Sequence, residues 1–476
     1  MREELEALWQ KVQPAFSQVR VFERAKRLAW SALLCLGRHT ITGFLTTAGR
    51  QFVDWSADYR IFEKQRVDMD TLFSVPRQAV MEHLEPEDPF VVLMDDTLLH
   101  KRGRKVAGTS WWRDPLGPPF RTNFVWGQRF LQISAALPEQ PGASRARAIP
   151  IDVHHCPSPK KPRKNAPPEE WKNYYELQNN MRISQQGVER LHHLRSVLTK
   201  EAPSRRLIVS VDGGYTNHTV FQNLPPHTVL LGRIRKDAKL YELPSSPSPG
   251  RGRKAAYGNP LPTPEAMRQE ESIPWQSVRA YAAGKIHEFD VKTVAPVRWR
   301  TAGGTMDLRL LIIRPLSYRL TKGSRLLYRD PAYLVCTDPH LPLEKFLQFY
   351  IWRNEIELNF RDEKTLLGAH QPQVHCKAST KLVPAFLAAS YAMLLVALHR
   401  TLEAKEAILP LLPKWRKKRG DGRVTTRQAI SLLRAELWGL ALEERDFSPF
   451  VTTSTSDTKP EKLVNALHSA AFYATG

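Results

Sequence analysis

Two apolar segments that end in acidic residues limit the possible folds of this chain most strongly. One segment, FVVLMDDT, spans Phe90–Thr97, and the other, RLIVSVD, spans Arg206–Asp212. Short runs of β-branched and large apolar residues are typical of strands that are buried on both faces of a sheet. Segments with a helical pattern lie between the strands. This alternation predicts an α/β protein with a mixed sheet covered by helices on both faces.

Further strands and helices follow from the same patterns. Strands are predicted at Arg129–Leu137, Ala148–His154 and Val229–Ile234, and helices over residues 168–199 and Asn217–Asn223. The segment 138–168 is rich in proline and contains four cations, so we expect a solvent-exposed basic loop within it. These cations are Lys160, Lys161, Arg163 and Lys164.

On this basis the chain divides into five regions. The first is a helical DNA-binding region, and a β-rich insertion separates the two parts of the α/β core. The predicted ranges are 1–75 for the helical region, 76–237 for the first part of the core, 238–330 for the insertion, 331–372 for the second part of the core, and 373–476 for a helical region of dimerisation and DNA contact. The last region includes a basic cluster at 414–423.

The segment WSALLCLGRHTITGFLTTAG, residues 30–49, has the pattern of a helix-turn-helix. An apolar helix is followed by a break at Gly37 and by a second helix that starts near Thr40. In such motifs the second helix and the residues before it reach DNA. Arg38, His39 and Thr40 are therefore the predicted DNA contacts of this region, although any pair of antiparallel helices can show this pattern.

The charge of the chain points to a polyanionic partner. Seventy Lys and Arg residues against 48 Asp and Glu residues give a formal net charge of +22. Nucleic acid fits such an excess, and an anionic membrane is the alternative. The most apolar stretch, Leu382–Leu398, contains Pro384 and is at the short limit for a membrane span, so we interpret it as a buried helix. We expect no membrane association.

The cysteines and the N-terminus favour a reducing compartment. Cys35, Cys156, Cys336 and Cys376 lie far apart in the sequence, and none belongs to a C-x-x-C pair. This spacing argues against a disulfide framework. The N-terminal segment MREELEALWQKV carries no apolar run typical of a signal peptide. We therefore expect the protein in the cytoplasm, at the nucleoid.

Two of three acidic positions lie where an α/β sheet usually places its site. Asp95 and Asp96 end the first apolar segment and Asp212 ends the second, and carboxyl ends of strands line the site of open α/β sheets. Because side chains alternate along a strand, only one of Asp95 and Asp96 can face the site. Clustered carboxylates can hold two divalent ions, which activate water and stabilise the leaving oxygen in phosphodiester hydrolysis.

The third acid is Glu357, which belongs to the array Tyr350, Arg353, Glu357 and Lys364 with the spacing Y-x2-R-x3-E-x6-K. On one continuous helix these four side chains fall within an arc of roughly 60°. Glu355 and Glu363 point the other way. A carboxylate can hold a divalent metal, while Arg and Lys bind phosphate oxygens, so the array fits phosphodiester chemistry.

These motifs together resemble those of bacterial insertion-sequence transposases of the DDE class. The likeness is to the cut-and-paste group with the YREK signature and an RNase H-like fold. It rests on DDT at 95–97, VDGGY at 211–215 and the four residues of the array, and it includes a β-rich insertion before the last acid.

The resemblance implies a mechanism and roles for individual residues. Asp96, Asp212 and Glu357 would be the catalytic acids that bind two Mg²⁺ ions, with Mn²⁺ able to substitute. Asp96 is preferred because the family pattern places its first Asp directly before Thr. Tyr350, Arg353 and Lys364 would contact DNA.

The resemblance also implies the DNA substrate and the assembly. A homodimer would bind the inverted-repeat ends of an insertion sequence, cleave them through a DNA hairpin and join them to double-stranded target DNA. An aromatic residue of the insertion region would stack on a flipped base. Tyr333, where the family pattern has Trp, and Trp299 are the candidates for that residue.

Two alternatives remain open from the sequence. One is a metal-dependent DNA nuclease on the same fold that cleaves without joining. The other is a domesticated DNA-binding protein without activity, which predicts the loss of at least one acid.

Overall fold

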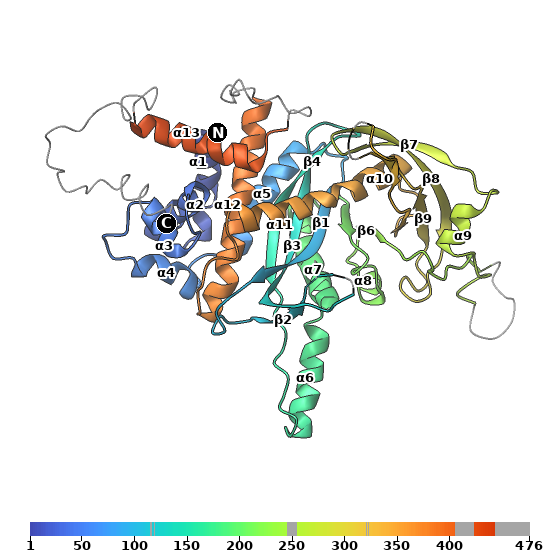
Figure 1. The fold of residues 1–476 in the computed structure, drawn as a ribbon, viewed down its shortest axis with the longest axis horizontal. Coiled ribbons are helices and arrows are strands. Elements are labelled where there is room, and N and C mark those ends of the chain that lie inside the picture. The colour runs from blue at the N-terminus through green and yellow to red at the C-terminus, as the bar shows by residue number, and fades with distance from the viewer. Residues whose placement is uncertain are drawn as a thin grey trace.

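The chain forms one large mixed sheet with helices on both faces (Figure 1). The structure is a computed structural model of the 476-residue chain, and it describes residues 1–114, 117–118, 120–244, 255–319, 321, 323–404 and 423–442. The strand order is β2-β3-β1-β5-β6-β12-β9-β8-β7, and β4 pairs with β3. The strands are β1 (Phe90–His100), β2 (Ser110–Arg113), β3 (Phe124–Pro138), β4 (Ala146–His155), β5 (Leu207–Val211), β6 (Thr228–Arg233), β7 (Gln276–Ala282), β8 (Lys285–Val297), β9 (Leu308–Ile313) and β12 (Ala332–Cys336).

Five of these strands form the core that the sequence predicts. In the order β4-β3-β1-β5-β6, the strands β1, β5 and β6 are mutually parallel, and β3 runs antiparallel to β1 and β4. The parallel strands are the apolar runs, as expected for strands buried on both faces. This arrangement confirms the predicted mixed α/β fold and is consistent with an RNase H-like core.

The predicted β-rich insertion continues the same sheet. Strands β7, β8 and β9 follow one another antiparallel, and β12 joins β9 to β6 of the core. A separate two-stranded ribbon, β10 (Ser317–Tyr318) and β11 (Leu327–Tyr328), precedes β12. The ranges 238–330 and 331–372 that we assign to the insertion and to the second part of the core remain a proposal.

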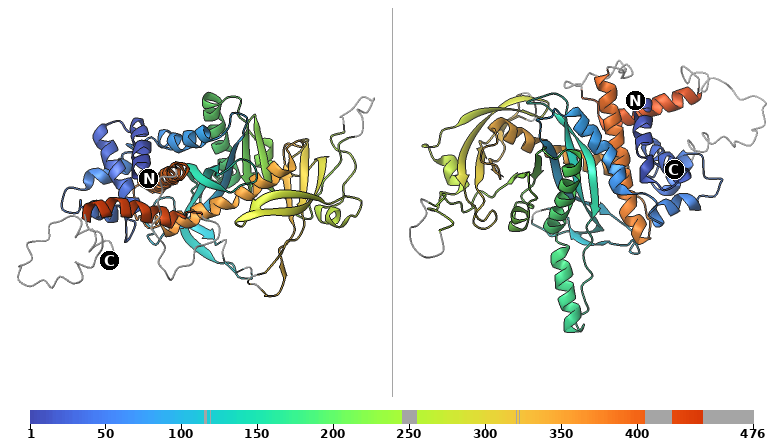
Figure 2. Two further views of the ribbon diagram at one scale, coloured as in Figure 1. Left: turned by 90° about the horizontal axis from the view of Figure 1, so that it is seen from above. Right: turned by 180° about the vertical axis from the view of Figure 1, so that it is seen from behind.

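Two groups of helices cover the two faces of the sheet (Figures 1 and 2). One face carries α10 (Leu343–Trp352) and α11 (Asn354–Thr365). The other face carries α5 (Met69–His83), α7 (Ile183–Glu201) and α12 (Lys377–Glu403). The remaining helices are α1 (Arg2–Lys11), η1 (Gln13–Ala15), α2 (Val19–Leu34), α3 (Ile41–Thr47), α4 (Ser56–Glu63), α6 (Pro168–Asn180), α8 (His218–Gln222), α9 (Pro264–Gln269) and α13 (Thr426–Leu442).

The helix α12 is the centre of the larger hydrophobic core. By length and composition alone it could cross a membrane, but 94% of its most apolar window is buried inside the protein. It packs against β4, against α5 and against the N-terminal helices α1, α2 and α4. The prediction of a buried helix at Leu382–Leu398 is therefore confirmed.

We expect α12 to dominate the stability of the fold. Leu394 lies on this helix and is 0% exposed, whereas Leu326 is 38% exposed. Replacing a buried Leu by Ala typically costs about 2–5 kcal/mol, because transfer energy is lost and a cavity remains. Leu394→Ala should lower the free energy of unfolding in urea by this amount, and the control Leu326→Ala should change it by less than about 0.5 kcal/mol. Equal effects of the two changes would contradict the central role of α12.

Candidate active site

The pairing of β1 with β5 places Asp95 beside Asp212. The two strands are parallel, with Leu93 opposite Ser210. Two residues further along come Asp95, in the middle of β1, and Asp212, directly after β5, and alternate residues of a strand share one face of the sheet. That face is the one covered by α10, since the Ser210 hydroxyl donates to the Phe349 carbonyl at 3.0 Å. Both carboxylates therefore face the side of the sheet where the array of α10 and α11 lies.

Arg353 connects these acids to Glu357. Its Nη1 lies 3.1 Å from Oδ2 of Asp95, and its Nη2 lies 2.8 Å from Oε1 of Glu357. The Arg353 side chain is largely buried, while that of Glu357 is 57% exposed. One guanidinium thus links a buried strand acid to an exposed helix acid, and Glu357 remains accessible to a substrate.

The array does not lie on one continuous helix as predicted. Helix α10 ends at Trp352 and α11 begins at Asn354, with Arg353 between them. Arg353 keeps helical angles, φ −51° and ψ −34°, but the surrounding amides bond to the carbonyl three residues back: Arg353 N to Tyr350 O, and Ile356 N to Arg353 O. The axis therefore continues while the hydrogen-bond pattern changes at the residue that contacts both acids.

The pKa of Asp95 shows a shortage of positive charge at this site. Burial raises it to about 7, and the nearby charge of Asp212 adds to the rise despite the opposing charge of Arg353. The Asp212 carboxylate is held by the Gly214 amide at 2.9 Å. Two adjacent carboxylates repel each other, and a divalent cation between them removes the repulsion. Asp95, Asp212 and Glu357 therefore fit the metal ions that this chemistry requires.

Tyr350 and a cation that the sequence did not suggest complete the surroundings. Burial raises the pKa of Tyr350, and the charges of Arg353 and Arg233 oppose that rise. Arg233 ends β6, and its Cβ lies 3.9 Å from the Cβ that Gly213 would carry. Only the pairing of β5 with β6 brings Arg233 to this place, so no sequence motif marks it.

Asp96 lies on the opposite face, which corrects the preference for it as the first acid. Arg129 binds it through both ends of its fork, Nε to Oδ2 at 2.7 Å and Nη2 to Oδ1 at 3.0 Å. The Tyr215 hydroxyl also donates to Oδ1 at 2.9 Å. Arg129 and Tyr215 together donate three hydrogen bonds to this carboxylate, so we interpret Asp96 as a structural residue. Asp95 takes the position beside Asp212.

The structure does not bring Lys364 to the acids. It lies two helical turns beyond Glu357, where burial lowers its pKa and Glu363 is its nearest charged partner. Among the residues that the structure describes, no hydrogen bond or ion pair joins Lys364 to Asp95, Asp212 or Glu357. Glu355 points elsewhere, as predicted, and its two carboxylate oxygens bind Arg423 at 3.1 and 2.6 Å.

The helix-turn-helix segment forms two helices, but its three predicted DNA contacts differ in their exposure to solvent. Arg38 is exposed. Thr40 is the N-cap of α3 and accepts from the Gly43 amide at 3.1 Å. His39 is 7% exposed, and burial lowers its pKa to about 4. The assignment of His39 as a DNA contact is therefore corrected, because its ring lies inside the protein.

Tyr333 and Trp299 are core residues, which corrects their assignment as stacking residues. Tyr333 on β12 is 5% exposed, and its hydroxyl donates to Glu265. Trp299 is 9% exposed and packs edge-on against Phe221 with ring centroids 5.8 Å apart. Neither ring is free to receive a base.

A basic arm extends from the rim of the site. The arm comprises residues 157–182, and its helix α6 has no buried residue (Figure 1). The predicted helix over 168–199 is thus two helices, α6 and α7. The end of the arm lies next to the loop after β5, which carries Asp212. The side-chain nitrogen Nδ2 of Asn217 in this loop donates both to Ser184 Oγ near the start of α7 and to Gly214 O, each at 2.8 Å.

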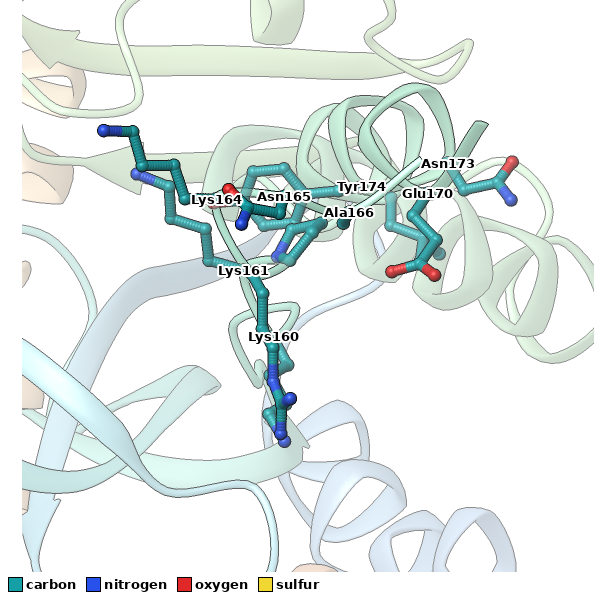
Figure 3. A pocket seen from close by; sticks show the side chains of 11 residues that line it. Lys160, Lys161, Lys164, Asn165, Ala166, Glu170, Asn173 and Tyr174 are labelled. Atoms are coloured by element: carbon teal, nitrogen blue, oxygen red, sulfur yellow. The ribbon is translucent and has the colours of Figure 1, made fainter. Parts of the chain in front are cut away.

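The loop of the arm and α6 enclose a hollow of about 1010 Å³ (Figure 3). Lysines 160, 161 and 164 extend from the loop, and the amino groups of Lys161 and Lys164 point away from Glu170. Lys161 lies over the Trp171 ring with its nitrogen 5.7 Å from the centroid. The segment contains six Lys or Arg residues and three Glu residues, so the arm carries a net positive charge.

Fold and site together define a class of protein: an RNase H-like nuclease core with one acid within β1, one directly after the parallel strand β5 and one on a covering helix. The comparison with known families agrees. The chain belongs to the DDE superfamily endonucleases, whose family model matches residues 13–305. This range contains Asp95 and Asp212 and ends before α11, so the place of Glu357 rests on geometry. A search of curated proteins finds no match.

The two neighbouring aspartates should differ in their effect on stability. In metal-free buffer, Asp96→Asn weakens both bonds from Arg129 and should lower the free energy of unfolding by roughly 1–3 kcal/mol. Asp95→Asn removes a repulsion with Asp212 as well as a contact with Arg353, so the two effects should nearly cancel. Urea unfolding of both variants in chelator measures the difference. A larger loss for Asp95→Asn would reverse our assignment of the two faces.

Proposed function

We propose that the protein is a DNA transposase that cleaves the inverted-repeat ends of an insertion sequence. The observation that carries this proposal is the pair Asp95 and Asp212 on one sheet face, with Arg353 linking Asp95 to Glu357. We assign these three acids as the catalytic, metal-binding residues, with two Mg²⁺ ions as cofactors and Mn²⁺ as a substitute. When bound, such ions supply an activated water and stabilise the leaving oxygen.

The residues of the chain prepare this site in defined ways. Arg353 holds Asp95 and Glu357 in fixed orientations, and the Gly214 amide does the same for Asp212. The exposed side of Glu357 leaves room for a DNA strand. Arg353 and Tyr350 are proposed to contact the phosphates flanking the scissile bond, and Lys364 and Arg38 those further away. Fixed partners of this kind reduce the reorganisation needed during the reaction.

The finer steps belong to the same proposal. We propose that a homodimer holds two ends, that cleavage passes through a DNA hairpin, and that the ends are joined to target DNA in the cytoplasm, at the nucleoid. Since Tyr333 and Trp299 are buried, we transfer the stacking role to Tyr328 on β11, which is 66% exposed. Tyr318 on β10 pairs with Leu327, so it faces the other side of this ribbon, and it carries Arg329 over its ring.

Two alternatives give different products. A nuclease without strand transfer would release the ends and leave them unjoined. A domesticated binding protein would lack the acid cluster, and the geometry of Asp95, Asp212 and Glu357 counts against it. Sequencing of target plasmids after incubation with protein and end DNA distinguishes joining from cleavage alone.

Cleavage should require each of the three acids and a divalent ion. The probe is a plasmid that carries the DNA flanking the coding region on both sides. Asp95→Ala, Asp212→Ala and Glu357→Ala should each reduce Mg²⁺-dependent cleavage by more than the 10–100-fold typical of losing an outer-shell partner. Binding to the same DNA in chelator should persist. Asp96→Asn is the matched control, and if it abolishes cleavage while Asp95→Ala does not, Asp96 is the first acid.

The arm is proposed to lie along the backbone of the bound duplex. Its helix α6 has 13 residues and is about 20 Å long, and its C-terminal end leads into α7, whose first turn contacts the loop after β5. Lys160, Arg163 and Lys164 are exposed, so their positive charges can contact a DNA strand that leaves the site. Contacts of this kind are made to phosphates and do not depend on base sequence.

Neutralising the arm should weaken binding uniformly. A triple variant with Lys160→Gln, Arg163→Gln and Lys164→Gln should bind two unrelated 30-bp duplexes more weakly by the same factor. Its salt slope should fall by about 2–3 units, because each lost phosphate contact removes about 0.9. The control replaces Lys200, Arg279 and Lys345 by Gln, which removes the same charge from exposed positions away from the acids. Equal slopes for the two triple variants would exclude the arm as a DNA contact.

A further inference from the structure

Three possible metal ligands from two helices meet far from the catalytic acids. His83 is the last residue of α5, and His399 and Glu403 lie at the end of α12. The atoms His83 Nδ1, His399 Nε2 and Glu403 Oε1 form a triangle. Its sides are 3.2 Å from His83 to Glu403, 3.3 Å from His83 to His399, and 3.4 Å from His399 to Glu403.

These distances match one face of a tetrahedral metal site. Zinc bonds to His nitrogen and carboxylate oxygen are about 2.0–2.1 Å long, and tetrahedral geometry then places the ligand atoms about 3.3 Å apart. The spacing H-x3-E from His399 to Glu403 puts two ligands on one face of α12. His83 supplies the third from α5, and the fourth position of a tetrahedron remains for water.

The hydrogen bond of His83 also favours a cation. Its Nε2 lies 2.9 Å from the Pro138 carbonyl, which can only accept, so Nε2 carries the proton. In the neutral ring Nδ1 then has a lone pair that faces the Glu403 carboxylate at 3.2 Å. A cation in contact with both atoms, either a proton on Nδ1 or a metal ion, removes the repulsion between them. A backbone carbonyl on the far nitrogen is also the usual partner of a metal-bound His.

The ligand types select the ion and separate this site from the acids. Two imidazoles and one carboxylate suit Zn²⁺ or a similar transition-metal ion, whereas Mg²⁺ prefers oxygen ligands. Pro138 is six residues along β3 from Gln132, the partner of Asp95, so the cluster is roughly 20 Å from the catalytic acids. An ion here would join the ends of α5 and α12, the two helices that cover the same sheet face.

We propose that His83, His399 and Glu403 bind one transition-metal ion of the Zn²⁺ class that fastens α12 to α5. The ion is structural and separate from the catalytic metals. The site was not apparent in the sequence because its ligands lie more than 300 residues apart, and the short H-x3-E motif alone has no specificity.

A titration of chelator-stripped protein with Zn²⁺ alone tests this site. To remove binding by the catalytic acids, the full-length chain carries Asp95→Asn and Asp212→Asn. One equivalent of Zn²⁺ should bind and raise Tm, and Mg²⁺ should not replace it. His399→Ala and Glu403→Gln should each weaken binding at least tenfold. His340→Ala is the control, because His340 is an exposed histidine elsewhere.

The outcomes are distinct. Glu403→Gln keeps the size and hydrogen-bonding capacity of the side chain, so it separates loss of metal from loss of fold. X-ray absorption of the one-equivalent complex should show two imidazole ligands. Absence of a bound equivalent in the parent protein, or its retention in both ligand variants, would overturn the proposal. Plasmid cleavage by protein with the wild-type acids reports on the proposed function separately.

Discussion

The parallel pairing of β1 with β5 is the constraint on which the site depends. It places Asp95, in the middle of β1, beside Asp212, directly after β5. Both strands are buried on both faces, so the two carboxylates are held near each other. Burial raises the pKa of Asp95, and the negative charge of Asp212 adds to the rise. The fold therefore disfavours the negative charge of Asp95, and Arg353 compensates for this only in part. The remaining unfavourable electrostatic energy explains why the position suits a divalent ion.

Arg353 can pair with Asp95 because α10 is fixed on the sheet. The apolar residues Phe346, Phe349 and Trp352 are buried in the core of this face, and the Phe349 carbonyl accepts from Ser210 on β5. The strand β5 thus fixes the positions of both Asp212 and the end of α10. The change in hydrogen-bond pattern at Arg353 then directs its guanidinium to Asp95 and Glu357 together. Packing of α10 on the sheet, more than the charges themselves, determines the position of the Arg353 guanidinium.

The sequence predicted the parts of this arrangement that depend on local pattern. The two acid-bearing strands, the mixed sheet and the buried helix at Leu382–Leu398 could all be recognised from apolar runs, although β1 continues past its acids to His100. The choice between Asp95 and Asp96 could not, because adjacency to Thr97 says nothing about which sheet face is covered by α10. For the same reason the burial of His39, Tyr333 and Trp299 could not be predicted. Whether a polar or aromatic side chain faces solvent is decided by elements that are distant in the sequence.

The position of α12 limits how a dimer can form. The proposed region of dimerisation and DNA contact, 373–476, begins with α12, which fills the core between β4, α5 and the N-terminal helices. A chain ending before α12 would lose that core, so this region is not a removable module. The basic cluster at 414–423 and the residues after 442 lie largely outside the described residues. Two copies that hold two DNA ends would therefore have to meet through surfaces other than α12. Its apolar side chains already hold the N-terminal helices and the catalytic sheet together as one unit.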